Sequence, residues 1–119
     1  PVPQPFISSR HTIRPLSALP TGPTVPVRDE EQDLQAEIEA CGEAEAIILD
    51  LDPAGMSPAV LGSWLAGCWP ALNVPIVFRA DREEILTAAI ASYPGRPGAC
   101  GPNGLAAAAG RLGALWLGD

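Results

Sequence analysis

One stretch near the middle of the chain limits the possible folds more than any other. The apolar residues 46–49 run directly into Asp50, Leu51 and Asp52, and Pro53 then ends the segment. A continuous apolar run is typical of a strand buried on both faces, whereas a half-exposed strand alternates apolar and polar residues. The sequence therefore predicts a parallel sheet. Its ligand crevice is expected at the carboxyl end of this strand, beside Asp50 and Asp52.

Two predicted helices flank this strand. Asp29 is a candidate N-cap for a helix that begins at Glu30, and Gly42 is placed to end it. Ser57 before Pro58 indicates a second helix start, because proline is well tolerated at the first helical position. The predicted apolar face of this second helix comprises Val60, Leu61, Trp64, Leu65 and Cys68.

The same alternation continues to the end of the chain. The further predicted elements are an apolar strand at 76–78, a helix at 83–92 capped by Asp81, a short strand at 98–100 and a helix at 104–115 capped by Asn103. Strands that alternate with helices favour right-handed crossovers and a parallel sheet. We therefore predict an α/β fold, a three-layer sandwich with helices on both faces of a parallel sheet.

The beginning of the chain has a different composition. Residues 1–27 hold seven of the fourteen prolines, which disfavour helix and favour extended chain. Within them, 6–7 and 24–27 are candidate strands, the latter at a sheet edge. The predicted organisation is a proline-rich arm or first-strand region at 1–27, followed by an α/β domain at 28–119.

Charge and composition exclude several classes of function. The formal net charge is −7, all seven bases are arginine, and ten of the fourteen acids lie between Asp29 and Asp52. Nucleic-acid binding needs a basic face, so no nucleic-acid partner is expected. The acidic stretch is either a solvated surface or a docking face for a basic partner.

The remaining composition gives no sign of a metal, a cofactor or a membrane segment. Three widely spaced cysteines and the single histidine, His11, do not form a usual zinc-ligand pattern, so neither metal nor cofactor is expected. No apolar run has membrane-spanning length, and residues 1–5 do not resemble a secretory signal. We expect a cytoplasmic protein without membrane association.

One strand end and one helix end have distinctive motifs. The strand end Asp50-Leu51-Asp52-Pro53-Ala54-Gly55-Met56 places an aspartate before a proline-glycine-methionine turn, and the following helix ends in Cys68-Trp69-Pro70. Together with the segments 73–80 and 98–102, these motifs resemble the receiver domain of two-component response regulators, over about residues 28–116. The resemblance implies a flavodoxin-like parallel sheet, with Asp50 at the position of the phosphoacceptor.

The residues that would support phosphorylation are missing from their expected positions. Ser8 and Ser9 take the place of the family's acidic metal-binding pair, and neutral hydroxyls are poor magnesium ligands. The family's switch hydroxyl aligns with Arg79 or Ala80, and the chain contains no lysine to stabilise an acyl phosphate. Asp50 is therefore a candidate vestigial phosphoacceptor.

Two weaker resemblances lead to a second interpretation. The pair Asp50 and Asp52 resembles the opening of haloacid-dehalogenase-type phosphatases, but Pro53 replaces the glycine of that motif. The glycine-rich loop 95–104 is similar to later units of pterin-binding barrels. This second similarity implies a small-molecule site or a subunit of a larger enzyme.

The sequence therefore predicts a non-catalytic, receiver-like protein-interaction module that works without aspartate phosphorylation. The alternative is a small accessory subunit or assembly factor of a larger enzyme, with a ligand at the carboxyl edge of the sheet. The candidate sheet-edge site comprises Ser8, Ser9, Asp52 and Arg79, and the candidate interface residues are Trp69 and Trp116. Protein partners are expected, in a homo- or hetero-oligomer.

Overall fold

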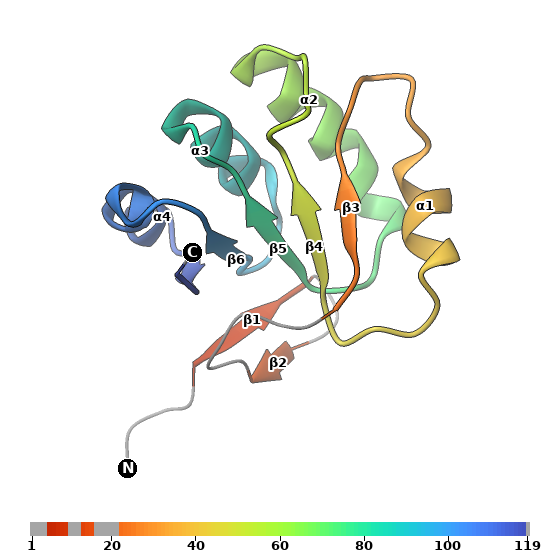
Figure 1. Cartoon of the computed structure of the whole chain (residues 1–119). Helices are drawn as coiled ribbons and strands as arrows, with labels where there is room; N and C mark the ends of the chain where they lie inside the picture. Colours follow the sequence, from red (N-terminus) through yellow and green to blue (C-terminus); the bar gives the residue numbers. More distant parts are fainter. Residues whose placement is uncertain (1–4, 10–12, 16–21, 119) are drawn as a thin grey trace.

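The main feature of the fold is a five-stranded parallel sheet in which the strands follow one another in chain order (Figure 1). The computed structural model describes residues 5–9, 13–15 and 22–118. The strands are β3 (Thr24–Pro26), β4 (Ile47–Asp50), β5 (Ile76–Arg79), β6 (Gly98–Cys100) and β7 (Leu115–Trp116). The predicted α/β class, the parallel sheet and the edge strand near 24–27 are confirmed.

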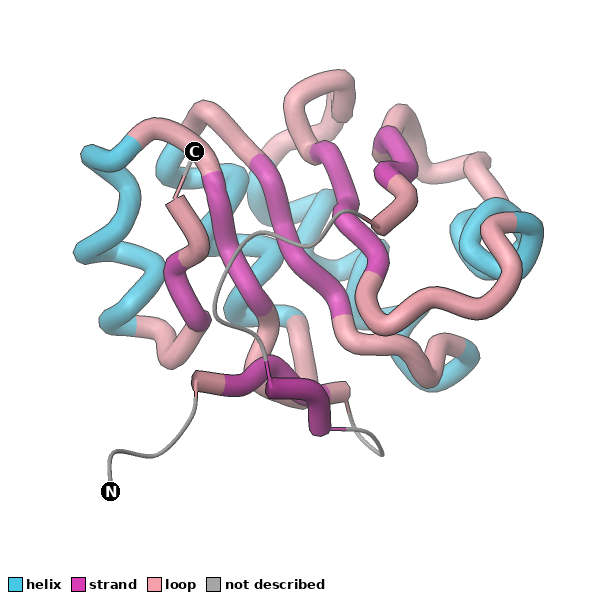
Figure 2. The backbone as a smooth tube through the Cα atoms, turned by 60° about the horizontal axis from the view of Figure 1, so that its bottom comes forward, coloured by secondary structure: helices cyan, strands magenta, loops and turns pink. Residues whose placement is uncertain are grey.

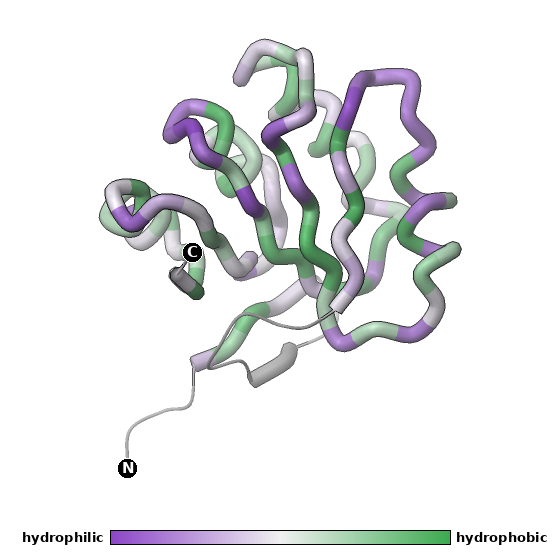
Figure 3. Tube along the Cα trace, in the orientation of Figure 1, coloured by the Kyte–Doolittle hydropathy of each residue, from purple (hydrophilic) through white to green (hydrophobic). Residues whose placement is uncertain are grey.

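The two central strands pair as their apolar runs predict. Ile47 lies opposite Ile76 and Leu49 lies opposite Phe78 in the parallel register, and all four side chains are buried. Burial of one such side chain contributes about 1.5–3 kcal/mol relative to leaving it in water. Figure 3 shows that the strands are hydrophobic along most of their length and become hydrophilic at their carboxyl ends.

All four helices pack on one face of this sheet. They are α1 (Leu34–Ala40), α2 (Pro58–Cys68), α3 (Glu83–Ser92) and α4 (Ala106–Arg111), with short 3-10 turns at Trp69–Ala71 and Asn103–Leu105. Buried side chains of every helix join a single hydrophobic cluster with Leu49 of β4 and Phe78 of β5. The helices form one layer behind the strands in Figure 2.

The opposite face of the sheet has a smaller cover. Ile48, Val77 and Cys100 point to this side and form a second cluster with Ile7. Ile7 belongs to β1 (Phe6–Ser8), which pairs antiparallel with β2 (Ile13–Pro15) in a separate two-stranded sheet. The expectation of helices on both faces is not met in the described residues. Right-handed crossovers between strands in chain order all turn to the same side.

The helix caps are only partly as predicted. Ser57 accepts a hydrogen bond from the Val60 amide at the start of α2. Helix α1, however, begins at Leu34, because Asp33 rather than Asp29 accepts the capping bond from Ala36. Asp29 instead accepts a hydrogen bond from the Glu31 amide in the preceding turn.

The last two predicted caps are wrong, and one strand was missed. The N-cap position belongs to Arg82 in α3 and to Leu105 in α4, so Asp81 and Asn103 do not stand at the N-cap positions predicted for them. Helix α4 ends at Arg111, and β7 follows it and pairs with β6. The predicted helix to Leu115 is too long because Gly113, with φ of 85°, turns the chain toward the sheet.

Trp69 is a core residue, which corrects its assignment as a candidate interface residue. Its side chain is 3% exposed and makes edge-to-face contacts with Phe78 and Tyr93, with centroid distances of 5.8 and 5.0 Å. The indole Nε1 donates a hydrogen bond to Ser92 Oγ at 3.1 Å. Trp69 therefore stabilises the packing of α2 and α3 on β5.

This aromatic cluster generates a pH prediction. Burial raises the pKa of Tyr93 to about 12, with the Ile76 backbone partly opposing the shift. Tyr93 is the only tyrosine in the chain, so the change in ultraviolet absorbance that accompanies tyrosinate formation reports it alone. We expect titration near pH 12 in the folded protein and near pH 10 in denaturant. The pKa of Tyr93 is higher in the folded state than in the unfolded state. Burial of the neutral hydroxyl therefore contributes fully to stability below about pH 10, and this contribution is lost as pH rises toward 12. Equal midpoints in both states would contradict the burial.

Candidate functional site

Three of the predicted site residues meet at the carboxyl edge of the sheet. Asp50 ends β4, Arg79 ends β5, and the two are direct neighbours in the parallel register. Asp52 follows β4 by two residues, and its Oδ2 lies 3.0 Å from Arg79 Nη1. Asp50 Oδ1 lies 4.0 Å from the same nitrogen. The structure therefore assembles one guanidinium between two carboxylates.

Asp52 also connects two loops through hydrogen bonds. Its Oδ1 accepts from the Asp81 amide at 2.8 Å, and its own amide donates to Asp50 Oδ1 at 3.1 Å. Asp50 and Asp52 therefore both accept hydrogen bonds from backbone amides, those of residues 52 and 81. These contacts fix the β4–α2 loop against the β5–α3 loop.

The electrostatics of this group favour the ionised arginine. Partial burial acts to lower the pKa of Arg79, but the nearby aspartates, Asp81 foremost, outweigh it and raise the pKa above its ordinary value. The side chains of Arg79 and Asp52 remain 39% and 30% exposed, so solvent screens the ion pair. The pair therefore contributes mainly orientation, within about 1 kcal/mol.

Gly101 occupies the position at which the receiver resemblance would place a lysine. Its φ is 146°, and a Cβ at this position would lie 2.2 Å from the Ala80 oxygen. Its amide donates to the Gly118 oxygen at 3.0 Å. A side chain is therefore sterically excluded here, because the backbones after β5 and β6 approach too closely.

Ser8 and Ser9 lie at the other end of the sheet, so the candidate site of four residues is not assembled. The Ser8 amide donates to the Arg96 oxygen at 2.7 Å, and Ser8 Oγ accepts from the Arg96 amide at 2.9 Å. Arg96 precedes β6, which puts this contact at the amino edge, where Figure 1 shows β1. Ser9 is 9% exposed. Ser8 therefore anchors β1 to the backbone before β6, at the end of the sheet opposite Asp52.

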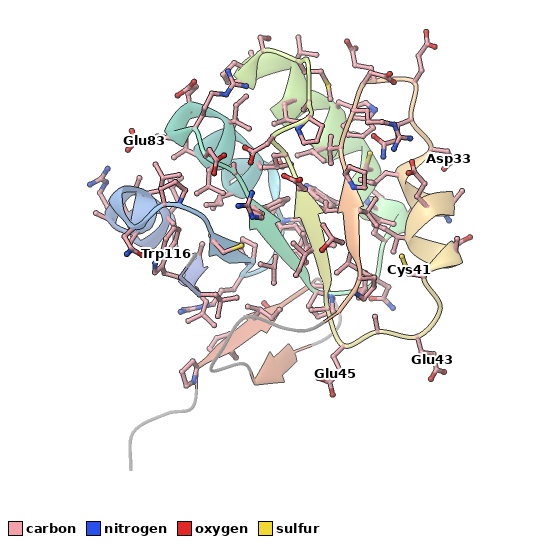
Figure 4. All side chains as sticks on the ribbon, in the orientation of Figure 1. Asp33, Cys41, Glu43, Glu45, Glu83 and Trp116 are labelled. Carbon is pink, nitrogen blue, oxygen red and sulfur yellow. The ribbon has the colours of Figure 1, made fainter. Side chains whose placement is uncertain are left out.

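Trp116 remains a candidate interface residue. It lies in β7 at the end of the sheet order, and its side chain is only partly buried against the helix-side cluster (Figure 4). Its neighbours Leu115 and Leu117 pack on the other face of the sheet. The alternation of a strand therefore directs Trp116 toward the helices.

The described residues contain no cluster of three or more side chains that could hold a metal ion. None of the three cysteines forms a disulfide, and burial, together with the charge of Asp33, raises the pKa of Cys68. A raised pKa keeps that thiol protonated and poorly nucleophilic. His11 lies outside the described residues. None of the helices in the described ranges is long and apolar enough to span a membrane.

A surface pocket was missed by the sequence analysis. It is an open depression of about 490 Å³, lined by Glu30, Ala59, Val60, Ser63 and Trp64. The predicted inner face of α2 included Val60 and Trp64, but only Leu61 and Leu65 of this helix are fully buried. Glu30 lies in the loop before α1, thirty residues before Val60 in the sequence. No local sequence pattern predicts that these two residues line the same pocket.

Substitution of Asp52 tests the structural role of the carboxyl-edge contacts. Asp52→Ala removes both the Arg79 pair and the acceptor for the Asp81 amide, and we expect a loss of about 1–2 kcal/mol in unfolding free energy. Asp52→Asn keeps a side-chain oxygen that can accept from the Asp81 amide, and it should lower the unfolding free energy by less than about 1 kcal/mol. Urea denaturation measures both values. Equal losses would show that the hydrogen bond to Asp81 carries no stability.

Neither a protein-family model, nor a curated protein, nor a solved structure matches this chain.

Proposed function

We propose that the chain is a non-catalytic protein-interaction module, receiver-like in sequence, that works without phosphorylation of Asp50. The observation that carries this proposal is the internal pairing at the carboxyl edge, where Asp50 and Asp52 contact Arg79 and backbone amides. The two carboxylates are engaged in contacts inside the protein. In this proposal, the surfaces around them bind the partner.

The chemistry of phosphoryl transfer supports this proposal. Transfer to a carboxylate needs cations that neutralise the charge on the incoming group. Arg79 Nη1 stands 1 Å closer to Asp52 than to Asp50, by the distances of 3.0 and 4.0 Å. The chain has no lysine, and the backbone contacts of Gly101 exclude a long cationic side chain there.

The distribution of charge supports an interaction surface. Nine carboxylates and three arginines lie in the segments 28–33, 50–52 and 79–84, which follow the carboxyl ends of β3, β4 and β5. The carboxyl edge thus carries most of the net charge of −7. A concentrated negative field accelerates encounter with a basic partner and disfavours nucleic acids and anionic membranes.

The relation to receivers is part of the proposal. A parallel sheet with four helices is compatible with a flavodoxin-like fold. The strand order is different, however. Flavodoxin-like sheets have the order 2-1-3-4-5. In this chain β3 pairs directly with β4, the strands follow one another in chain order, and β1 lies outside that sheet. A cytoplasmic location is likewise proposed, supported by three cysteines that form no disulfide.

One observation favours the alternative of an accessory subunit or assembly factor of a larger enzyme. Parallel strands in chain order, with every helix on one face, are also the building scheme of βα barrels. The resemblance of loop 95–104 to pterin-binding barrels agrees with this scheme. The small ligand of this alternative would lie at the carboxyl edge.

The absence of the phosphorylation switch is tested chemically. Incubation with magnesium and acetyl phosphate, or with beryllium fluoride, should leave the intact mass and the amide NMR spectrum unchanged. The physical reason is that Arg79, the cation beside Asp50, is paired more closely with Asp52, and that the chain has no lysine to neutralise an incoming phosphoryl group. A stoichiometric adduct that disappears in the Asp50→Asn variant would overturn the proposal.

The interaction role is tested by co-purification of the tagged chain from its native cells, with quantitative mass spectrometry. We expect stoichiometric enrichment of a protein that bears a basic surface, and its release as salt rises. Signalling or transcription proteins would support the module, and subunits of a metabolic enzyme would support the alternative. Recovery of the chain alone, at low salt, would contradict both.

A further inference from the structure

The pocket beside α2 is an unfilled apolar surface next to the acidic loop. Val60 is 39% exposed, although valine is usually buried, and Trp64 is only partly buried. Both line the pocket of about 490 Å³ together with Glu30. An apolar floor that ends in a tryptophan can bury a side chain from a partner, and tryptophan also attracts a cation to its ring face.

Glu30 lines the pocket, and its sequence neighbours Asp29 and Glu31 extend it into an acidic rim of three consecutive exposed residues. Among the ion pairs of the described residues, none involves Glu30 or Glu31. The nearest base in sequence, Arg28, already pairs with Glu37. The carboxylates at the rim are therefore available to a cation from outside.

The charge also decides which occupant fits. A second copy of the chain would bring its own charge of −7 against the same acidic edge. A nucleic acid or an anionic lipid surface would be repelled in the same way. A basic protein segment has the opposite charge, and it needs at least one apolar side chain for the floor of the pocket.

We propose that Val60 and Trp64, with Glu30 and Glu31 at the rim, form the docking site for a basic amphipathic segment of a partner protein. The segment places an aliphatic side chain against Val60 and Trp64 and its arginine or lysine side chains beside Glu30 and Glu31. This inference rests on the proposed interaction function and names the surface and chemistry of its partner. Affinity then falls as salt rises, because exposed pairs are screened.

The test uses the full chain and three synthetic peptides of equal length. The first has leucines on one helical face and arginines on the other. The second has glutamate in place of arginine, and the third has serine in place of leucine. Amide and indole shifts in ¹H–¹⁵N spectra locate the binding site and give the dissociation constants.

Two variants and a matched control assign the contacts. Glu30→Lys with Glu31→Lys reverses the rim, and Val60→Ser removes apolar contact at an exposed position. Glu43→Lys with Glu45→Lys makes the same change of charge at the opposite end of the molecule, where Figure 4 shows both glutamates. Circular dichroism of each variant confirms the fold.

The first peptide should bind and shift the amides around Val60 and the Trp64 indole. Binding should be about tenfold weaker in the rim variant and several-fold weaker in Val60→Ser, and unchanged within about twofold in the control. The second and third peptides should bind at least about tenfold more weakly than the first. Equal binding to the rim variant and the control would overturn the site. Equal binding of all three peptides would also overturn the site. Val60 shifts that change with protein concentration in the absence of peptide would overturn it too, because they would show a second copy of the chain at this surface.

The failure of this inference is distinguishable from failure of the proposed function. If a natural partner co-purifies equally well with the wild type and the rim variant, the docking site is wrong and the interaction role stands. If no partner is recovered, the function is wrong whatever the peptides do.

Discussion

Direct pairing of parallel strands in chain order is the constraint on which the rest of the structure depends. Each crossover leaves one strand and enters its immediate neighbour, so all right-handed crossovers turn to the same side. One face of the sheet therefore receives every helix and the larger hydrophobic cluster. The other face is left to Ile7 and its short hairpin. The loops that leave the carboxyl ends then gather along one edge and bring their charges together.

Much of the fold could be predicted because its signals are local. The apolar run that ends at Asp50 and the run 76–78 specify buried strands whatever lies around them. Ser57 with Pro58 specifies a helix start through a hydrogen bond and a fixed φ. Strand order is not local, since it depends on which neighbours pair. The alternation of strands and helices in the sequence is the same whether the helices cover one face of the sheet or both. The prediction of helices on both faces was therefore wrong.

The candidate site was predicted in part for a similar reason. Asp50 and Arg79 each end a predicted parallel strand, so their meeting follows from the sheet. Ser8 was assigned by resemblance, and its hydrogen bonds with the Arg96 backbone lie at the amino edge. Trp69 was assigned from its place at a helix end, but its ring fits between Phe78 and Tyr93. Such tertiary contacts have no signature in the nearby sequence.

The two rims of the main sheet have a consequence for behaviour at high concentration. The Val27 amide donates a hydrogen bond inward to the Asp50 oxygen of β4. Because the backbone groups of successive strand residues point to opposite sides, the nitrogen of Pro26 faces outward, and proline has no N–H to donate to another strand. At the opposite rim, β7 contributes only two residues. Both borders thus give a poor template for strands of other molecules. Fibre growth by edge addition is disfavoured, and the chain can remain dispersed in solution while its acidic edge stays accessible.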